Sequence, residues 1–445
     1  MSSSETPRQG DGALFEPIGR TTSAYYLTVA GLLLLVGWGV ASYVYQWVYG
    51  LGVTGLNRPV AWGFYITNFV FFIGISHAGT LISAILRLSH AEWRRPITRM
   101  AEVITVVVLG IGGMNILVDL GRPDRALNVL LQGRYQSPLL WDATSISAYL
   151  TASTIYLWLP MIPDLAMLRD RGRRWRWLYG VLALGWTGTE RQHRVLNRAV
   201  AIMAVMVIPI AVSVHSVVSF VFSMTLQPGW HSTIFGPYFV VGAIFSGIAA
   251  LIITMIVIRR IYHLERYLKP VHFRNLGTLL LLMSLLWFYF TFAEYLTGYY
   301  GNEPEEVGIM WSKFNGPFAP FFWGMVIANF VVPVLVLSFW RTIPGTFIAS
   351  VTALIGMWVE RYIIIVPTLS HPLLPQDVWA YLPSIIELGE TVGSFALFVL
   401  MFAVFIKLFP IISVWEIQEG REEALEVTTK RILSYLPDES LQGQT

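Results

Sequence analysis

Long runs of apolar residues alternate with short polar stretches along the whole chain of 445 residues. A membrane-spanning helix needs about 20 predominantly apolar residues to cross roughly 30 Å of hydrocarbon. The pattern therefore predicts an all-α polytopic membrane protein with about ten transmembrane helices, near residues 24–48, 60–87, 100–118, 142–166, 199–222, 235–259, 276–297, 318–340, 344–364 and 388–412.

The composition favours the same class of protein. Hydrophobic residues make up 55% of the chain and charged residues 13%, against about 25% charged in an ordinary soluble domain. The net charge of +3 is spread along the chain, so nothing indicates a nucleic-acid partner.

The positive charges of the loops predict an orientation. Lys and Arg concentrate in loops on the cytoplasmic side of a membrane, and here they gather after the second, fourth, sixth and eighth apolar runs. The loops on the opposite side carry only a few: Arg58, Arg122, Arg125, Arg134, Lys313 and Arg361. We therefore expect both termini in the cytoplasm and the odd-numbered loops outside.

A faint internal repeat divides the predicted helices into two groups. The entry to the sixth helix resembles the entry to the second, and Glu294 ends the seventh helix where Asp119 ends the third. Glu360 and Arg361 occupy the place in the ninth helix that His215 has in the fifth. Two four-helix bundles with two flanking helices follow, and the expected division is residues 1–56, 57–222, 223–366 and 367–445.

Two carboxylates converge on the outward loop between the third and fourth helices. Asp119 ends one helix, Arg122 follows it closely enough to form a pair with it, and Asp142 lies in the first turn of the next helix. Ionisable groups near hydrocarbon are costly and often functional. An equally open interpretation is a structural pair at Asp119 and Arg122, with Asp142 as an ordinary helix cap.

Two histidines lie inside apolar runs, and a tyrosine enters the second helix. A neutral imidazole at His77 or His215 is able to accept a proton from a hydroquinone, because its reference pKa is near ~6.5. The alternatives are a hydrogen bond between helices, or a haem held between the two rings. Tyr65 offers a hydroxyl amid apolar neighbours, where belts of anchoring Tyr and Trp are also common.

A second acidic group follows from the repeat. Glu294, Glu360, Arg361 and Glu390 form a candidate proton path on the outward side. For Glu390 and its neighbour Glu387, solvated carboxylates at the membrane surface are the favoured interpretation.

Cysteine is absent from the sequence. The chain therefore offers no thiolate to an iron–sulfur cluster and no covalent haem attachment, and no metal site is expected. Electrons that pass through such a protein must be carried by another subunit.

Four segments together carry a resemblance to a known family: residues 57–87, Asp119–Arg125, Ser137–Asp142 and Val214–Ser219. They look like the NrfD or polysulfide-reductase membrane-anchor family, and most closely the quinol-oxidising membrane subunit of bacterial alternative complex III. The similarity extends over roughly residues 45–410.

The resemblance implies a subunit of a respiratory or photosynthetic complex in the bacterial inner membrane. Such a subunit has no redox centre of its own, oxidises menaquinol near the periplasmic face and passes electrons to a periplasmic iron–sulfur subunit, with coupled proton release or translocation. Multihaem cytochrome c subunits and a homologous membrane subunit are the further partners that the resemblance implies. On this basis His77, Asp119, Asp142 and His215 are the candidate quinol-binding residues, with Arg122 and Tyr65 in support.

Two other functions remain open. One is a membrane anchor or proton-conducting subunit without a quinol site, in which the second acidic group matters most. The other is a secondary transporter, which is less favoured because paired Gly or Pro breaks at matching helix midpoints are missing.

Overall fold

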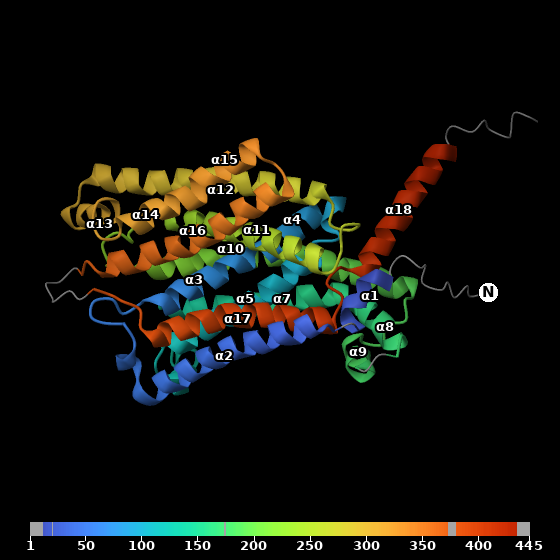
Figure 1. Cartoon of the computed structure of the whole chain (residues 1–445), viewed down its shortest axis with the longest axis horizontal. Helices are drawn as coiled ribbons and strands as arrows, with labels where there is room; N and C mark the ends of the chain where they lie inside the picture. The colour runs from blue at the N-terminus through green and yellow to red at the C-terminus, as the bar shows by residue number, and fades with distance from the viewer. Residues whose placement is uncertain (1–11, 20, 173–174, 373–379, 434–445) are drawn as a thin grey trace, which may run out of the picture.

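The computed structural model describes residues 12–19, 21–172, 175–372 and 380–433, and these residues form helices and loops without a strand. Most of the long helices run side by side along the long axis, and α18 leaves the bundle at an angle (Figure 1). The α-helices are α1 Gly12–Gly19, α2 Ser23–Tyr49, α3 Phe64–His77, α4 Ser83–Leu88, α5 Thr98–Asp119, α6 Asn128–Leu131, α7 Pro138–Trp158, α8 Ile162–Asp170, α9 Arg176–Leu182, α10 Glu190–Ser223, α11 Phe235–Ile261, α12 Pro270–Gly301, α13 Pro304–Phe314, α14 Ala319–Val326, α15 Val332–Phe339, α16 Ile343–Leu369, α17 Ile385–Leu408 and α18 Val414–Leu433.

Nine helical segments among the described residues are long and apolar enough to cross a membrane. Two of them join α-helices through one π-helical turn, η2 Ala78–Ile82 between α3 and α4, and η6 Ile327–Val331 between α14 and α15. The all-helical, polytopic membrane class predicted from the sequence is thus confirmed.

The predicted span at 142–166 is the exception. Its residues form α7 and, after a short 3-10 turn, α8, and α7 is not among the nine apolar segments. Its sequence is interrupted by Ser, Thr and Tyr, which lowers its hydropathy. α7 nevertheless packs against α10 and α5, so it belongs to the helix bundle.

Helix packing follows the order of the chain. Contacts join α3, α5, α7 and α10 to one another, and a second set joins α11, α12, α15 and α16. α11 also packs against α3 and α10, so the two groups share one continuous interface.

α2 and α17 form a close pair along one side of the molecule (Figure 1). A Cβ on Gly39 would lie 3.0 Å from the Cα of Gly393. Only glycine allows the two backbones to approach this closely, which is a common way of packing helices in membranes.

The two ends of the bundle differ in content. One end carries α1, α8, α9 and α18, and we name it the α18 end; the other carries α13 and is named the α13 end (Figure 1). The basic residues Arg94, Arg95 and Arg99 contact α18 or the turn before it. The assignment of the α18 end to the cytoplasm stays a prediction based on this charge.

Candidate functional site

Two histidines meet in the interior of the bundle. His77 ends α3, His215 lies in α10, and both side chains are fully buried. Their ring centroids are 3.7 Å apart. Nε2 of His77 lies 2.5 Å from the carbonyl oxygen of Ala211, whereas neither ring nitrogen of His215 has a hydrogen-bond partner among the described residues.

This geometry argues against a haem between the two histidines. An iron atom held by both rings needs a metal–nitrogen distance of about 2 Å on each side, and rings whose centroids are 3.7 Å apart leave no such space. The two rings, as they lie here, do not fit around a single iron atom. The free nitrogens of His215 keep the pair able to exchange protons.

The two predicted aspartates both lie at the α13 end, on neighbouring helices. Asp119 is the last residue of α5 and Asp142 lies in the first turns of α7, and these helices pack together. One carboxylate oxygen of each, Oδ1, is buried without a hydrogen-bond partner among the described residues. Buried polar atoms are nearly always paired in native proteins, so each of these oxygens is available to a ligand.

Arg122 does not hold Asp119 as predicted. Its Nη2 lies 3.0 Å from Oδ2 of Asp124, and both side chains are largely exposed. The 3-10 turn at Pro123–Arg125 places Asp124 beside Arg122, so the predicted pair is replaced by a local, solvated one.

Glu390 lies in the first turns of α17 and is 6% exposed. Neither of its carboxylate oxygens has a hydrogen-bond partner among the described residues. Tyr65 is close beside it, but the hydroxyl of Tyr65 donates to Oε1 of Gln46 at 2.5 Å. The prediction of a solvated Glu390 is wrong, and Glu390 stands near Tyr65 rather than with Glu294 and Glu360.

Glu387, one turn earlier, has a structural role that sequence reasoning missed. Its side chain is fully buried and accepts hydrogen bonds from the backbone nitrogens of Gly55 and Ser384, at 2.6 and 2.8 Å, and from the hydroxyl of Tyr381 at 2.6 Å. It thereby ties the loop before α3 to the start of α17. The signal was present in Ser384, whose spacing to Glu387 is that of a capping box.

A pocket of about 180 Å³ opens between α2, α5 and α17. Its walls are mostly apolar, and the polar side chains on them belong to Glu390, Asn115, Ser394 and Tyr43. Val118, the neighbour of Asp119, is part of the wall. An apolar slot with a buried, unpaired carboxylate suits a ring that carries hydroxyl or carbonyl groups.

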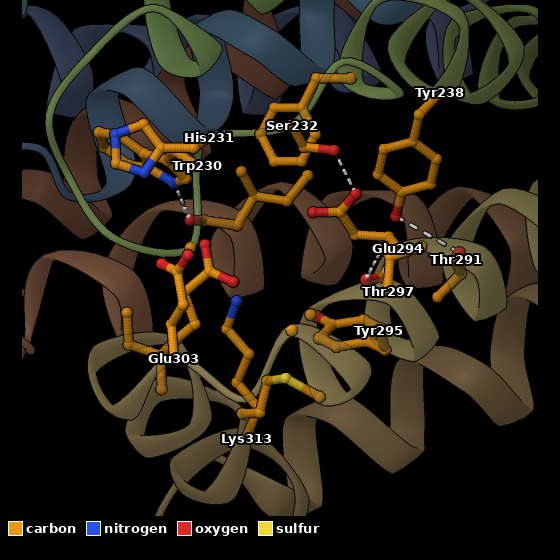
Figure 2. A pocket seen from close by; sticks show the side chains of 18 residues that line it. Trp230, His231, Ser232, Tyr238, Thr291, Glu294, Tyr295, Thr297, Glu303 and Lys313 are labelled. Atoms are coloured by element: carbon orange, nitrogen blue, oxygen red, sulfur yellow. Dashed lines mark hydrogen bonds between the residues drawn. The ribbon is translucent and has the colours of Figure 1, made fainter.

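The remaining predicted residues lie in the second group of helices. Glu294 of α12 accepts a hydrogen bond from Ser232. Glu360 and Arg361 are adjacent in α16, both 1% exposed, with Oε2 and Nη1 3.0 Å apart. Trp287 donates to Oε1 of Glu360 at 2.7 Å. The other polar side chains around Glu294 line a larger cavity (Figure 2).

No cluster of three or more metal-binding side chains occurs in the described part of the chain. The candidate residues themselves carry carboxyl, imidazole, hydroxyl and ammonium groups, which form hydrogen bonds and exchange protons. Two centres stand out, the pocket at Glu390 and the cavity at Glu294.

Comparison with known proteins places the chain in a family. Residues 52–371 match the family described as polysulphide reductase, NrfD. The chain belongs to this family. The resemblance seen in the sequence is confirmed, whereas its narrower likeness to alternative complex III is not tested by this match.

Three similar proteins are named as membrane subunits of oxidoreductases. A protein of Halobacterium salinarum, named as a membrane component of a dimethyl sulfoxide reductase, is 28% identical over 87% of this chain and 91% of its own length. The Hdr-like menaquinol oxidoreductase integral membrane subunit of Archaeoglobus fulgidus is 24% identical over 92% of this chain and 99% of its own length. The menaquinone reductase integral membrane subunit of Nitratidesulfovibrio vulgaris is 24% identical over 87% of this chain and 92% of its own length.

Proposed function

We propose that this NrfD-family chain is the quinone-reactive membrane subunit of a multi-subunit oxidoreductase. It binds menaquinol at the α13 end, oxidises it, and passes the electrons to an iron–sulfur subunit docked outside the membrane at that end. The names of two relatives, a menaquinol oxidoreductase subunit and a menaquinone reductase subunit, support the quinone class. The α13 end is the outward, periplasmic end in this proposal.

The observation that carries the proposal is the slot between α2, α5 and α17 with its unpaired acid. Glu390 is buried without a hydrogen-bond partner in a wall that is otherwise largely apolar. A buried acceptor without a partner is unfavourable by about 1–3 kcal/mol. A quinol hydroxyl that donates to Glu390 removes this cost, and the apolar wall takes the ring.

The neighbouring groups fit the proton chemistry of the reaction. Oxidation of menaquinol to menaquinone releases two protons and two electrons. Glu390 accepts the proton of one hydroxyl, and Asp119, which lies within electrostatic range of Glu387 on the same helix as Glu390, is the acceptor for the other. Asp142 on α7 receives protons next, on the way to the surface.

Removal of these protons makes the quinol a better electron donor, so proton acceptance and electron loss are coupled. The electrons leave to a cluster in the partner subunit, because the chain contains no cysteine to hold one itself. Tyr65 lies close to Glu390, and its hydroxyl donates to Gln46.

The test is menaquinol oxidation by the purified assembly carrying Glu390→Gln. We expect a loss of about 100-fold, the usual contribution of a general base, while the other subunits still co-purify with the chain. Asp124→Asn is the matched control, because Asp124 lies at the same end, is exposed and pairs only with Arg122. Normal turnover in Glu390→Gln would remove the proposed site.

One observation supports a second candidate function, a proton-conducting subunit without a quinol site. Glu360 and Arg361 form a fully buried ion pair in α16, and Nη2 of Arg361 has no hydrogen-bond partner among the described residues. This function predicts that Glu360→Gln reduces proton transport while no quinone co-purifies with the wild-type chain.

A further inference from the structure

A cavity of about 400 Å³ lies at the α13 end of the second group of helices. Its walls come from the loop before α11, the end of α12 and the helix α13, and one residue of α16 closes it. Figure 2 shows Ser232, Tyr238, Glu294, Tyr295 and Lys313 around the space. None of these residues lines the slot at Glu390.

Lys313 is the unusual member of this wall. Its side chain is 5% exposed, yet it forms no ion pair with any residue that the structure describes. Nζ lies 5.8 Å from the centroid of the Tyr295 ring. Burial lowers the pKa of Lys313 to about 8, although Glu294 acts in the opposite direction. A lysine whose pKa lies this close to physiological pH is mostly charged there, but it gives up and regains its proton readily.

Glu294 faces the same space. It accepts a hydrogen bond from Ser232 and interacts electrostatically with Lys313 and Glu306. The other titratable groups that line the cavity are His231, Tyr238, Tyr295, Glu303 and Glu306. His231 and Glu303 are exposed, so they lie on the solvent side.

Polar groups continue from the cavity into the bundle. The hydroxyl of Tyr238 lies 3.4 Å from Oγ1 of Thr291 and interacts with Glu360. Glu360 is paired with Arg361, and Arg361 lies within electrostatic range of His215. His215 in turn contacts His77. The series therefore runs from solvent at the α13 end to the histidine pair between the two groups of helices.

We propose that this cavity is a proton-exchange port, in which Glu294 and Lys313 transfer protons between outside solvent and the buried carboxylate of Glu360, which is paired with Arg361. Each step moves one proton between a donor and an acceptor and involves no electron. The port releases protons in addition to those that the quinol itself releases, and these additional protons are taken up from solvent at the α18 end. In this respect the inference rests on the proposed function, which supplies the driving reaction.

The first test does not depend on quinol. The chain contains four lysines, Lys269, Lys313, Lys407 and Lys430, so reductive methylation of the intact assembly is easily assigned by mass spectrometry. We expect Lys313 to react with a midpoint near its lowered pKa of about 8, and Glu294→Gln to move the midpoint lower. Exposed Lys269 is the reference. Failure of Lys313 to react at any pH, or an unchanged midpoint in Glu294→Gln, would overturn the port.

The second test measures protons released per electron by the assembly in liposomes during menaquinol oxidation. In Glu294→Gln and Lys313→Met we expect turnover to persist and the ratio to fall to the one proton per electron that the quinol supplies. An unchanged ratio in both variants, at normal or reduced turnover, contradicts the port. Loss of turnover in Glu390→Gln with a normal methylation midpoint of Lys313 identifies the quinol site separately, so the two proposals fail independently.

Discussion

Several buried acids at the two ends of this molecule differ in whether they have a charged or hydrogen-bonding partner. At the α18 end they are paired: Nη1 of Arg99 lies 2.5 Å from Oδ2 of Asp164, and the oxygens of Asp164 accept the backbone nitrogens of Val414 and Trp415 at 3.0 Å. Glu416 is bound by Arg87 at 2.5 Å. At the α13 end, Glu387 is hydrogen-bonded, but Asp119, Asp142 and Glu390 keep buried oxygens without a partner among the residues that the structure describes.

The paired charges have a structural role, whereas the unpaired acids are candidates for a chemical one. Charges that are paired and hydrogen-bonded inside a protein fix the geometry around them, and here they fasten the start of α18 to α5 and α8. Unpaired buried acids stabilise nothing in the chain itself, and such groups are common at sites of reaction. The unpaired acids at the α13 end are therefore the ones to which we assign the proposed quinone chemistry.

The largest expected effect is a loss of stability when the buried ion pair at the α18 end is broken. Arg99→Met leaves Asp164 as an uncompensated buried charge, so the free energy of unfolding should fall by about 3–5 kcal/mol. Denaturant unfolding in detergent measures this. The double variant with Asp164→Leu should recover part of the loss, and menaquinol oxidation per folded molecule should stay normal in both. A double variant less stable than the single one would show that the pair is not the cause.

Glu416→Gln tests how the stability of the α18 end depends on pH. Burial alone would raise the pKa of Glu416, but Arg87 and Arg94 outweigh it, so the pKa lies below its ordinary value of 4.5. The wild-type chain therefore gains stability from this carboxylate above pH 4.5 and loses it as the pH falls through the lowered pKa. In Glu416→Gln we expect about 1.5–3 kcal/mol less stability at pH 7 and a smaller decline in acid. Exposed Glu422→Gln should behave as wild type in thermal unfolding at both pH values.

At the unpaired end, Asp142→Asn should act on turnover rather than on folding. Loss of one hydrogen bond from a charged acceptor corresponds to about tenfold in rate. Steady-state menaquinol oxidation measures it, with unfolding as the control. Normal turnover would remove Asp142 from the mechanism and leave the slot between α2, α5 and α17 as the whole site.

The smallest effect concerns Lys313, a buried cation at the end where charges lack partners. Its pKa of about 8 lies below the ordinary value of 10.5. Between these values the unfolded chain binds more protons, so stability should rise with pH in this window. Lys313→Met should abolish the rise in thermal unfolding midpoint, and Lys269→Met should keep it. A rise that persists in Lys313→Met would belong to other groups.

Hydropathy was sufficient for the helical class and for most of the membrane segments, because a helix in lipid must be apolar along its whole length. The segment at 142–166, predicted as a span, forms α7 within the bundle although it is less apolar than the others; its hydroxyls are satisfied along the helix, and Thr144 and Ser147, for example, bond to backbone carbonyls one turn earlier.

The site was only partly predictable. Asp119, Asp142 and the two histidines stand out because ionisable groups are rare in apolar runs. The ion-pair partners of these residues were not predictable from the sequence. Arg122 pairs with Asp124, two residues away, and not with Asp119. The slot at Glu390 depends on α17 lying against α2 and α5, residues far apart in sequence, and no local pattern encodes that contact.

The central claim is tested most directly by a photoreactive menaquinone analogue bound to the purified assembly. After illumination, the account predicts labelled residues on α5 between Met114 and Val118 and on α17 between Glu390 and Leu397, with excess menaquinone preventing the reaction. Labelling confined to the α18 end, or to the cavity at Glu294, would contradict it.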